Sequence, residues 1–136
     1  MSKKTILFIC THNSARSQMA EGYVNTFLSE AYLAKSAGTK PSVVNPYAIQ
    51  VMKEIGVDIS ASRSKNLSEF RGEEFDYVVT VCSDAEDICP FFLGKEHIHH
   101  GFKDPSALDG NEEKITAGFR ESRDEIIRWI RKEFKG

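Results

Sequence analysis

The chain alternates between short runs of strand-forming residues and longer segments in which apolar residues recur at helical spacing. Thr5 to Ile9 is an unbroken strand-forming run, which is typical of a strand covered on both faces in a parallel sheet. Polar residues follow it, and a helix is then indicated by apolar positions at Met19, Ala20, Tyr23, Val24, Phe27 and Leu28. The start of the chain therefore predicts strand, loop and helix in that order.

The next part of the chain predicts a second strand and a second helix. Weak alternation over residues 32–37 ends at Gly38. Asn45 is a favourable N-cap and Pro46 suits the first position of a helix, which we expect to end at Gly56. Residues 57–75 are less regular, and they leave room for a short strand and a single helical turn.

The second half of the chain repeats the alternation. Residues 76–81 form a β-branched run, and residues 97–100, before Gly101, indicate a short further strand. A last helix is expected to begin near Asn111, with an apolar stripe at Ile115, Phe119, Ile126, Ile130 and Phe134. Strands that alternate with helices indicate the α/β class, and we predict a three-layer α/β/α sandwich around a central, parallel, four-stranded sheet.

Length and charge narrow the partners of this fold. The 136 residues contain no low-complexity linker, so we interpret residues 1–136 as one domain. Eighteen basic and twenty acidic side chains give a net charge of −2, which argues against nucleic acid or an anionic membrane as a partner. The apolar runs are too short for a membrane span or a signal peptide. We therefore expect a cytoplasmic protein, and we expect a monomer.

Cysteine and histidine usage raises the question of chemistry. Three cysteines are an odd number for a disulfide framework, and thiols stay reduced in the cytoplasm. Catalysis, metal binding or burial must account for them. His97, His99 and His100 lack cysteine or carboxylate ligands at a suitable spacing, so a polar edge strand is a simpler explanation than zinc. We expect no metal and no bound cofactor.

The residues that follow each predicted strand contain the candidate chemistry. They are Cys10, residues 36–38, Cys82 and Asp104. Ligands of open parallel sheets bind beyond the carboxyl ends of the strands. Two of the cysteines and one carboxylate are therefore expected at the same edge of the sheet.

Residues 10–17 form a Cys-x5-Arg segment between a buried strand and a helix N-terminus. Backbone N–H groups in such a loop can point into one hollow and bind a tetrahedral oxyanion; the candidate residues are Thr11, His12, Asn13, Ser14, Ala15 and Ser17. Arg16 can hold two oxygens of the anion, and the same positive field stabilises the thiolate form of Cys10. Ser17 can donate a further hydrogen bond to the sulfur. An isolated match would favour an inert, buried cysteine, but this context favours a nucleophile.

Motifs throughout the chain resemble those of one known family. They are the loop Cys10 to Ser17, the following Gln18 to Gly22, Asn45-Pro46, Gly56 to Ser60, Val79 to Cys82, Cys89-Pro90 and Phe102 to Pro105. Together they resemble the thioredoxin-coupled arsenate reductases, which share the fold of the low-molecular-weight protein tyrosine phosphatases. The loop and Asp104-Pro105 are common to both branches, whereas Cys82 and Cys89 resemble the reductase branch.

The resemblance implies a thiol relay. Cys10 would attack arsenate held by Arg16 and the loop, while Asp104 protonates the departing oxygen. Cys82 would then attack Cys10, and Cys89 would attack Cys82, so that thioredoxin receives a Cys82–Cys89 disulfide. Thioredoxin is the implied electron donor, and phosphate or sulfate would compete with arsenate for the loop.

The spacing of Cys82 and Cys89 places a demand on the segment between them. If residues 83–88 were helical, the two cysteines would lie about 10.5 Å apart along the helix axis. The Cα atoms of a disulfide usually lie about 4.4–6.8 Å apart. We therefore expect this segment to unwind or loop out when the disulfide forms.

Two loop residues and one lysine depart from the family pattern. His12 stands where relatives commonly have glycine, and its role is open. Ala15 stands where many relatives have another cysteine, so a resolving thiol must be Cys82 or Cys89. Some of these reductases bind potassium near Asn13, Glu21 and Ser36. Lys65 lies in the region where an acidic ligand is expected, so the resemblance does not imply that metal here.

Two other functions compete with arsenate reduction. A phosphatase would use Cys10, Arg16 and Asp104 through a cysteinyl-phosphate, although Ser106 and Ala107 replace the tyrosines often found after Asp-Pro in phosphatases. A redox or oxyanion sensor would use the disulfide state to control a partner, but the sequence offers no regulatory segment. The reductase remains the preferred hypothesis.

Overall fold

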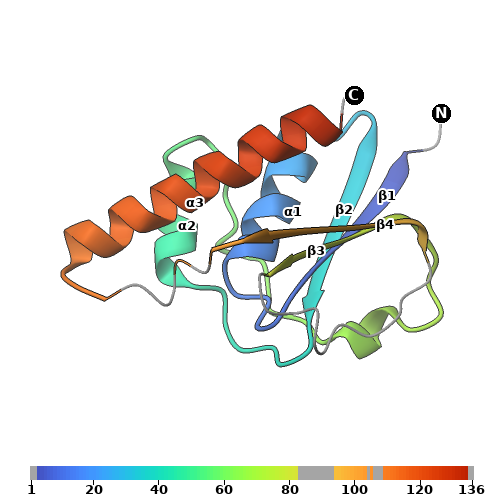
Figure 1. The fold of residues 1–136 in the computed structure, drawn as a ribbon, viewed down its shortest axis with the longest axis horizontal. Helices are drawn as coiled ribbons and strands as arrows, with labels where there is room; N and C mark the ends of the chain where they lie inside the picture. Colours follow the sequence, from blue (N-terminus) through green and yellow to red (C-terminus); the bar gives the residue numbers. More distant parts are fainter. Residues whose placement is uncertain (1–2, 83–93, 104, 106–108, 135–136) are drawn as a thin grey trace.

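The computed structural model describes residues 3–82, 94–103, 105 and 109–134. Its strands and helices follow the order predicted from the sequence (Figure 1). The elements are β1 (Lys4–Cys10), α1 (Arg16–Phe27), β2 (Tyr32–Gly38), α2 (Pro46–Lys53), the 3-10 helix η1 (Leu67–Phe70), β3 (Phe75–Cys82), β4 (Gly94–Phe102) and α3 (Glu112–Glu133).

The four strands form one parallel sheet in the order β2-β1-β3-β4. β1 lies inside the sheet, and its residues Ile6, Leu7 and Phe8 are completely buried. This burial explains why the first strand reads as a continuous run rather than as an alternating one. The predicted fold class, a three-layer α/β/α sandwich on a parallel sheet, is confirmed.

The layers on the two faces of the sheet are unequal (Figure 1). The face under α1, α2 and α3 carries the larger apolar cluster, which includes Phe8, Met19, Met52 and Phe119. The other face carries a smaller cluster that reaches from the sheet to Phe70 in η1. Side chains of β1 alternate between the two clusters, so this strand joins both halves of the core.

The irregular segment before β3 contains the single helical turn that the sequence allowed, which is η1. The short strand allowed there is reduced to one bridge between Gly38 and Asn66. The helix α2 ends at Lys53, three residues before the predicted Gly56. Gly56 instead adopts a positive φ of 83° in the turn that follows, a conformation that glycine enters without strain. No helix among the described residues is long and apolar enough to span a membrane.

An ion cluster joins α2 to α3. Arg120 and Arg123 on α3 both donate hydrogen bonds to the Glu54 carboxylate, at 2.7 and 2.9 Å for the shortest bond of each. The hydrogen bonds from Arg120 are the main reason why the pKa of Glu54 falls from 4.5 to about 2. Arg123 also donates to the carbonyl of Val51 at 2.8 Å, so the cluster fixes α3 against the end of α2.

Glu54→Gln should therefore destabilise the protein at neutral pH and have less effect in acid. The folded-state pKa lies below the unfolded value, so the ionised carboxylate stabilises the fold above about pH 4.5 and loses this contribution as the pH falls toward about 2. Because the side chain is 33% exposed, screening by water limits the loss of stability at pH 7 to about 1 kcal/mol.

Urea unfolding at several pH values measures this loss of stability. Glu121→Gln, at an exposed position of α3, is the control; a Glu54→Gln deficit that persists at pH 2 contradicts the interpretation.

Candidate functional site

The carboxyl ends of the strands meet at one edge of the sheet, as the sequence predicted. Cys10 ends β1 and pairs with Gly38 at the end of β2. Cys82 ends β3, the other neighbour of β1, and pairs with Phe102 where the register of β4 shifts. Irregular pairing of this kind changes the direction of a strand and is common next to functional sites. The side chain of Cys82 and the whole of Cys89 and Asp104 lie outside the described residues.

The loop of residues 10–17, called the oxyanion loop below, is held from outside through its carbonyl groups. Each successive carbonyl from residue 11 to residue 14 accepts a hydrogen bond from a neighbouring segment. The pairs are Thr11 O with Lys40 N at 2.8 Å, His12 O with Ser64 Oγ at 2.8 Å, Asn13 O with Gln18 Nε2 at 3.2 Å and Ser14 O with Asn45 N at 2.9 Å.

This outward orientation of the carbonyls directs the amide groups inward. The described peptide bonds are all trans, and in a trans peptide the N–H of the next residue points opposite to the carbonyl. The N–H groups of residues 12–15 therefore face the space that the loop encircles. Several amides that converge in this way bind an anion. The Cys-x5-Arg pattern predicted such a hollow, and the hydrogen bonds to the carbonyls explain why the amides face into it.

The N-terminus of α1 adds to the positive field of the loop. Asn45, Asn66 and Asn111 cap α2, η1 and α3 with side-chain hydrogen bonds. In contrast, Ala15 at the start of α1 provides no side-chain cap, and the first turn holds no acidic residue. The first amides of α1 and the positive end of its dipole are thus directed toward the loop.

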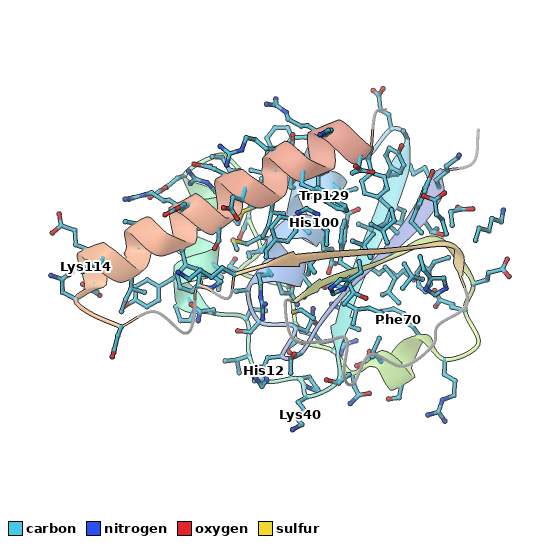
Figure 2. The ribbon with its side chains drawn as sticks, viewed as in Figure 1. His12, Lys40, Phe70, His100, Lys114 and Trp129 are labelled. Atoms are coloured by element: carbon cyan, nitrogen blue, oxygen red, sulfur yellow. The ribbon has the colours of Figure 1, made fainter. Side chains whose placement is uncertain are left out.

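Backbone conformation shows how the loop accepts His12 in place of glycine. Asn13, with φ of 49°, is the only described non-glycine residue at positive φ, and asparagine tolerates this region better than most residues. His12 is outside that region, so its side chain causes no such strain. Its Nδ1 lies 3.0 Å from the carbonyl of Lys40, and a carbonyl only accepts, so Nδ1 carries the proton. Figure 2 shows His12 and Lys40 close together beside the loop.

Gly38 allows the second strand to approach the oxyanion loop closely. A Cβ at this position would lie 2.5 Å from the carbonyl oxygen of Thr11, 2.8 Å from that of Cys10 and 2.9 Å from the amide of Asn13. All three contacts are with backbone, which has little freedom to move. The end of β2 therefore has to be glycine for the loop to keep its shape.

The sulfur of Cys10 lies at the base of this loop. The residue is 2% exposed, and its Sγ lies 2.8 Å from Ser17 Oγ. Asn13 Nδ2 donates to the same Ser17 oxygen at 2.8 Å. A thiolate only accepts hydrogen bonds. When Cys10 is ionised, Ser17 therefore accepts from Asn13 and donates its own proton to the sulfur, which stabilises the anionic form.

Arg16 brings a permanent positive charge to the same edge. The residue is 4% exposed, and one guanidinium nitrogen donates to the carbonyl of Phe102 at 3.1 Å. This bond holds the guanidinium at the strand ends where Cys10 also lies. A guanidinium fixed in this way suits the binding of two oxygens of an anion.

A second layer of polar contacts lies behind the loop, in the region where the family resemblance located the potassium site of some reductases. Lys65 Nζ lies 3.6 Å from Glu21 Oε1, and the same Glu21 oxygen accepts a hydrogen bond from Ser36. An ammonium group already ion-paired with Glu21 would repel a potassium ion, so these residues do not fit that metal. Among the described residues, no group of three or more His, Cys, Asp or Glu side chains could hold a metal ion.

Of the three histidines of β4, His100 makes the aromatic contacts that the described residues show. His100 stacks on Trp129 of α3 with ring centroids 5.1 Å apart and an interplanar angle of 25°, and both residues are labelled in Figure 2. It also contacts the ring of Phe102 at 4.7 Å between centroids. His100 therefore joins the edge strand to the last helix.

A buried thiol within a ring of inward amides, at the end of a parallel strand, is suited to forming a bond between sulfur and a tetrahedral oxyanion. The chain belongs to the family described as low molecular weight phosphotyrosine protein phosphatase, whose model matches residues 5–134.

Within this family the chain is similar to proteins named as arsenate reductases. One, from Halalkalibacterium halodurans, is 45% identical over 132 residues that cover 96% of this chain and 95% of the relative. A solved arsenate reductase in the phosphate binding state is 29% identical, with a TM-score of 0.68 and coverage of 93% of this chain and 98% of that one. A thioredoxin-dependent arsenate reductase of Corynebacterium glutamicum is 26% identical, with a TM-score of 0.66 and coverage of 97% and 64%.

Proposed function

We propose that this protein reduces arsenate to arsenite through Cys10, Cys82 and Cys89, with thioredoxin as the electron donor. The observation that carries the proposal is the buried contact of 2.8 Å between Cys10 Sγ and Ser17 Oγ, inside a loop whose amides face inward. The similarity to relatives named as arsenate reductases supports the choice of oxyanion. The thioredoxin-dependent relative supports the choice of donor.

The chemistry begins with the Cys10 thiolate. It attacks the arsenic atom of arsenate bound by the oxyanion loop and Arg16, and a sulfur–arsenic bond replaces an arsenic–oxygen bond. Asp104 donates the proton with which the displaced oxygen leaves as water. In the next step the thiolate of Cys82 attacks the sulfur of Cys10, and the electron pair of the sulfur–arsenic bond passes to arsenic. Arsenite leaves, and the two thiols have lost two electrons to form a disulfide.

Two thiol exchanges then restore the enzyme. Cys89 attacks Cys82 and releases Cys10 as a thiolate, and the dithiol of thioredoxin reduces the resulting Cys82–Cys89 disulfide. The position of the strand ends supports the first disulfide. Cys10 and Cys82 end the hydrogen-bonded neighbours β1 and β3. Ile9 pairs with Thr80, so Cys82 comes one residue after the position opposite Cys10. With about 4.8 Å between neighbouring strands and a rise of about 3.3 Å per residue, two such Cα atoms lie about 6 Å apart, within the range that a disulfide spans.

Hydrolysis of phosphate monoesters is the second candidate function, because the family description itself names a phosphotyrosine phosphatase. The oxyanion loop, Arg16 and Asp104 would serve both reactions, since phosphate and arsenate share charge and tetrahedral shape. Cys82 and Cys89 would have no role in the hydrolysis. A modest phosphatase activity is compatible with the reductase proposal, whereas a phosphatase without arsenate reduction is not.

Coupled turnover tests the proposed function. In a mixture of the protein, thioredoxin, thioredoxin reductase and NADPH, addition of arsenate should start a steady consumption of NADPH. Omission of thioredoxin should stop it, and phosphate should slow it by competing for the loop. If NADPH consumption does not depend on arsenate, the proposed function is wrong.

A further inference from the structure

Lys65 and Glu21 form an ion pair behind the oxyanion loop. The Lys65 side chain is 12% exposed and the Glu21 side chain 19% exposed, so water screens this pair less than a surface pair. Lys65 Nζ also donates to the carbonyl of Arg63 at 2.9 Å. Glu21 accepts in addition from Ser36. The ammonium group thus ties residues 63–65 to α1 and, through Ser36, to β2.

The backbone of Lys65 contacts the oxyanion loop and the strand beside it. Its N–H donates to Asn13 Oδ1 at 2.8 Å, and its carbonyl accepts from Gly38 N at 2.9 Å. A shift of this backbone would therefore remove a donor from the Asn13 side chain. The ion pair with Glu21 is one of the side-chain contacts that hold this segment, together with the hydrogen bonds of Gln18 Nε2 to Arg63 O and of Ser64 Oγ to His12 O.

The contact with Lys65 determines which way the amide of Asn13 faces. Asn13 Oδ1 accepts from the Lys65 N–H and from Gln18 Nε2, the latter at 2.9 Å. Since a backbone N–H only donates, Oδ1 has to face Lys65, and Nδ2 is left to donate to Ser17 at 2.8 Å. Ser17 then directs its own proton to the Cys10 thiolate.

We propose that Lys65 and Glu21 are positioning residues for Cys10: their ion pair holds Asn13 in the orientation that makes Ser17 donate to the sulfur. The proposal rests on the proposed function only in taking Cys10 as the nucleophile. Lys65 supplies, from the chain itself, a positive charge behind the loop. It acts through Asn13 and Ser17 rather than by contact with the oxyanion.

A direct electrostatic effect gives different expectations from a positioning effect. Removal of Lys65 disfavours the thiolate in either case. Removal of the negative Glu21 would favour the thiolate if charge acted directly through space. If the pair acts by positioning, loss of Glu21 also releases the Lys65 backbone and disfavours the thiolate. The sign of the Glu21 effect therefore separates the two mechanisms.

The experiment measures alkylation of Cys10 by iodoacetamide as a function of pH, with the modified peptide resolved by mass spectrometry. Lys65→Met and Glu21→Ala should each raise the pH of half-maximal alkylation by about 0.5 to 1 unit, the effect of weakening one hydrogen bond to the thiolate. Lys35→Met is the matched control, since it removes another Lys–Glu contact of 3.6 Å, that with Glu73. It should leave the midpoint unchanged. The proposal is overturned if the midpoint falls in Glu21→Ala, or if the midpoint of Lys65→Met or of Glu21→Ala stays unchanged.

A double-mutant cycle tests whether the effect passes through Ser17. Ser17→Ala alone should raise the midpoint by about 1 unit. Adding Lys65→Met to Ser17→Ala should then raise it no further, because the transmitting hydroxyl is absent. An additive shift overturns the proposal. Thermal unfolding of each variant checks that it is folded. If Lys65→Met does not fold, the same cycle is run with Glu21→Ala and Ser17→Ala.

Other charged or titratable side chains contribute to the field around this site. Among the described residues they include His12 on the loop, Arg16 on α1, Lys40 after β2, Arg63 beside Lys65, and Glu69 on η1, which pairs with Arg63 at 2.6 Å and also interacts with Lys65. All of them are retained in the compared variants, so differences in the midpoint report the changed residues. The assay uses neither arsenate nor thioredoxin. Its outcome is therefore separate from that of the coupled turnover assay.

Discussion

Replacing Cys10 with serine should lower arsenate-dependent turnover by at least about 1,000-fold, because the nucleophile that forms the bond to arsenic is lost. A serine hydroxyl is un-ionised at neutral pH and gives no sulfur for the later exchange. Hydrolysis of aryl phosphates should fall with it, since both reactions would use the same thiolate. The coupled NADPH assay and release of p-nitrophenol measure the two rates.

Anion binding provides the control for Cys10→Ser. The inward amides and Arg16 are unchanged in this variant, so phosphate should still bind with an affinity close to that of the original protein, as measured by calorimetry. Loss of both binding and turnover would indicate a collapsed loop instead of a missing nucleophile. Retention of turnover above about one tenth of the original rate would contradict the assignment of Cys10.

Cys82→Ser should abolish multiple turnover with arsenate while leaving aryl phosphate hydrolysis within about twofold. The reductase requires a second thiol to take the electron pair away from Cys10, whereas phosphate ester hydrolysis needs only the loop and a proton donor. This contrast separates the two candidate functions with one variant. Both rates are measured on the same preparation, by NADPH consumption and by p-nitrophenol release.

The phosphatase rate is the internal control for Cys82→Ser, because it shows that the loop is intact. If the variant reduces arsenate at the original rate, Cys82 is not the resolving thiol. If it loses both activities, the end of β3 has a structural role that the relay does not require.

The residues at this edge of the sheet could be predicted because the end of each strand is visible in the local sequence pattern. Runs of strand-forming residues located β1 and β3, and the parallel arrangement then placed Cys10, Gly38 and Cys82 at one edge. The N-cap of α2 at Asn45 was equally readable, since capping depends on the next two or three residues.

The contacts behind the oxyanion loop could not be predicted in this way. Ser64 and Lys65 each bond to a loop residue that is 52 positions earlier in the chain, and the segment that contains them has no regular spacing of apolar residues. The family resemblance placed Glu21 and Lys65 in one region, but nothing in the pattern of the chain indicated that they form an ion pair. Their partners are defined only by the tertiary structure.

The sequence pattern also could not predict how the helices are distributed over the two faces of the sheet. An apolar stripe shows which side of a helix is buried, but it does not show which face of a sheet that side covers. Met52 of α2 and Phe119 of α3 lie in the same cluster, so both helices pack on the face that α1 also covers. Among the described helices, only η1 contributes to the cluster on the opposite face, through Leu67 and Phe70.

Mapping of disulfides after a single exposure to arsenate tests the thiol relay most directly. The measurement compares the original protein with Cys89→Ala, both first reduced and then treated with arsenate in the absence of thioredoxin, by mass spectrometry of the digested chains. The relay predicts a Cys82–Cys89 disulfide in the original protein and a trapped Cys10–Cys82 disulfide in the variant, both dependent on arsenate. Absence of any arsenate-dependent disulfide at Cys10 in the variant would contradict it.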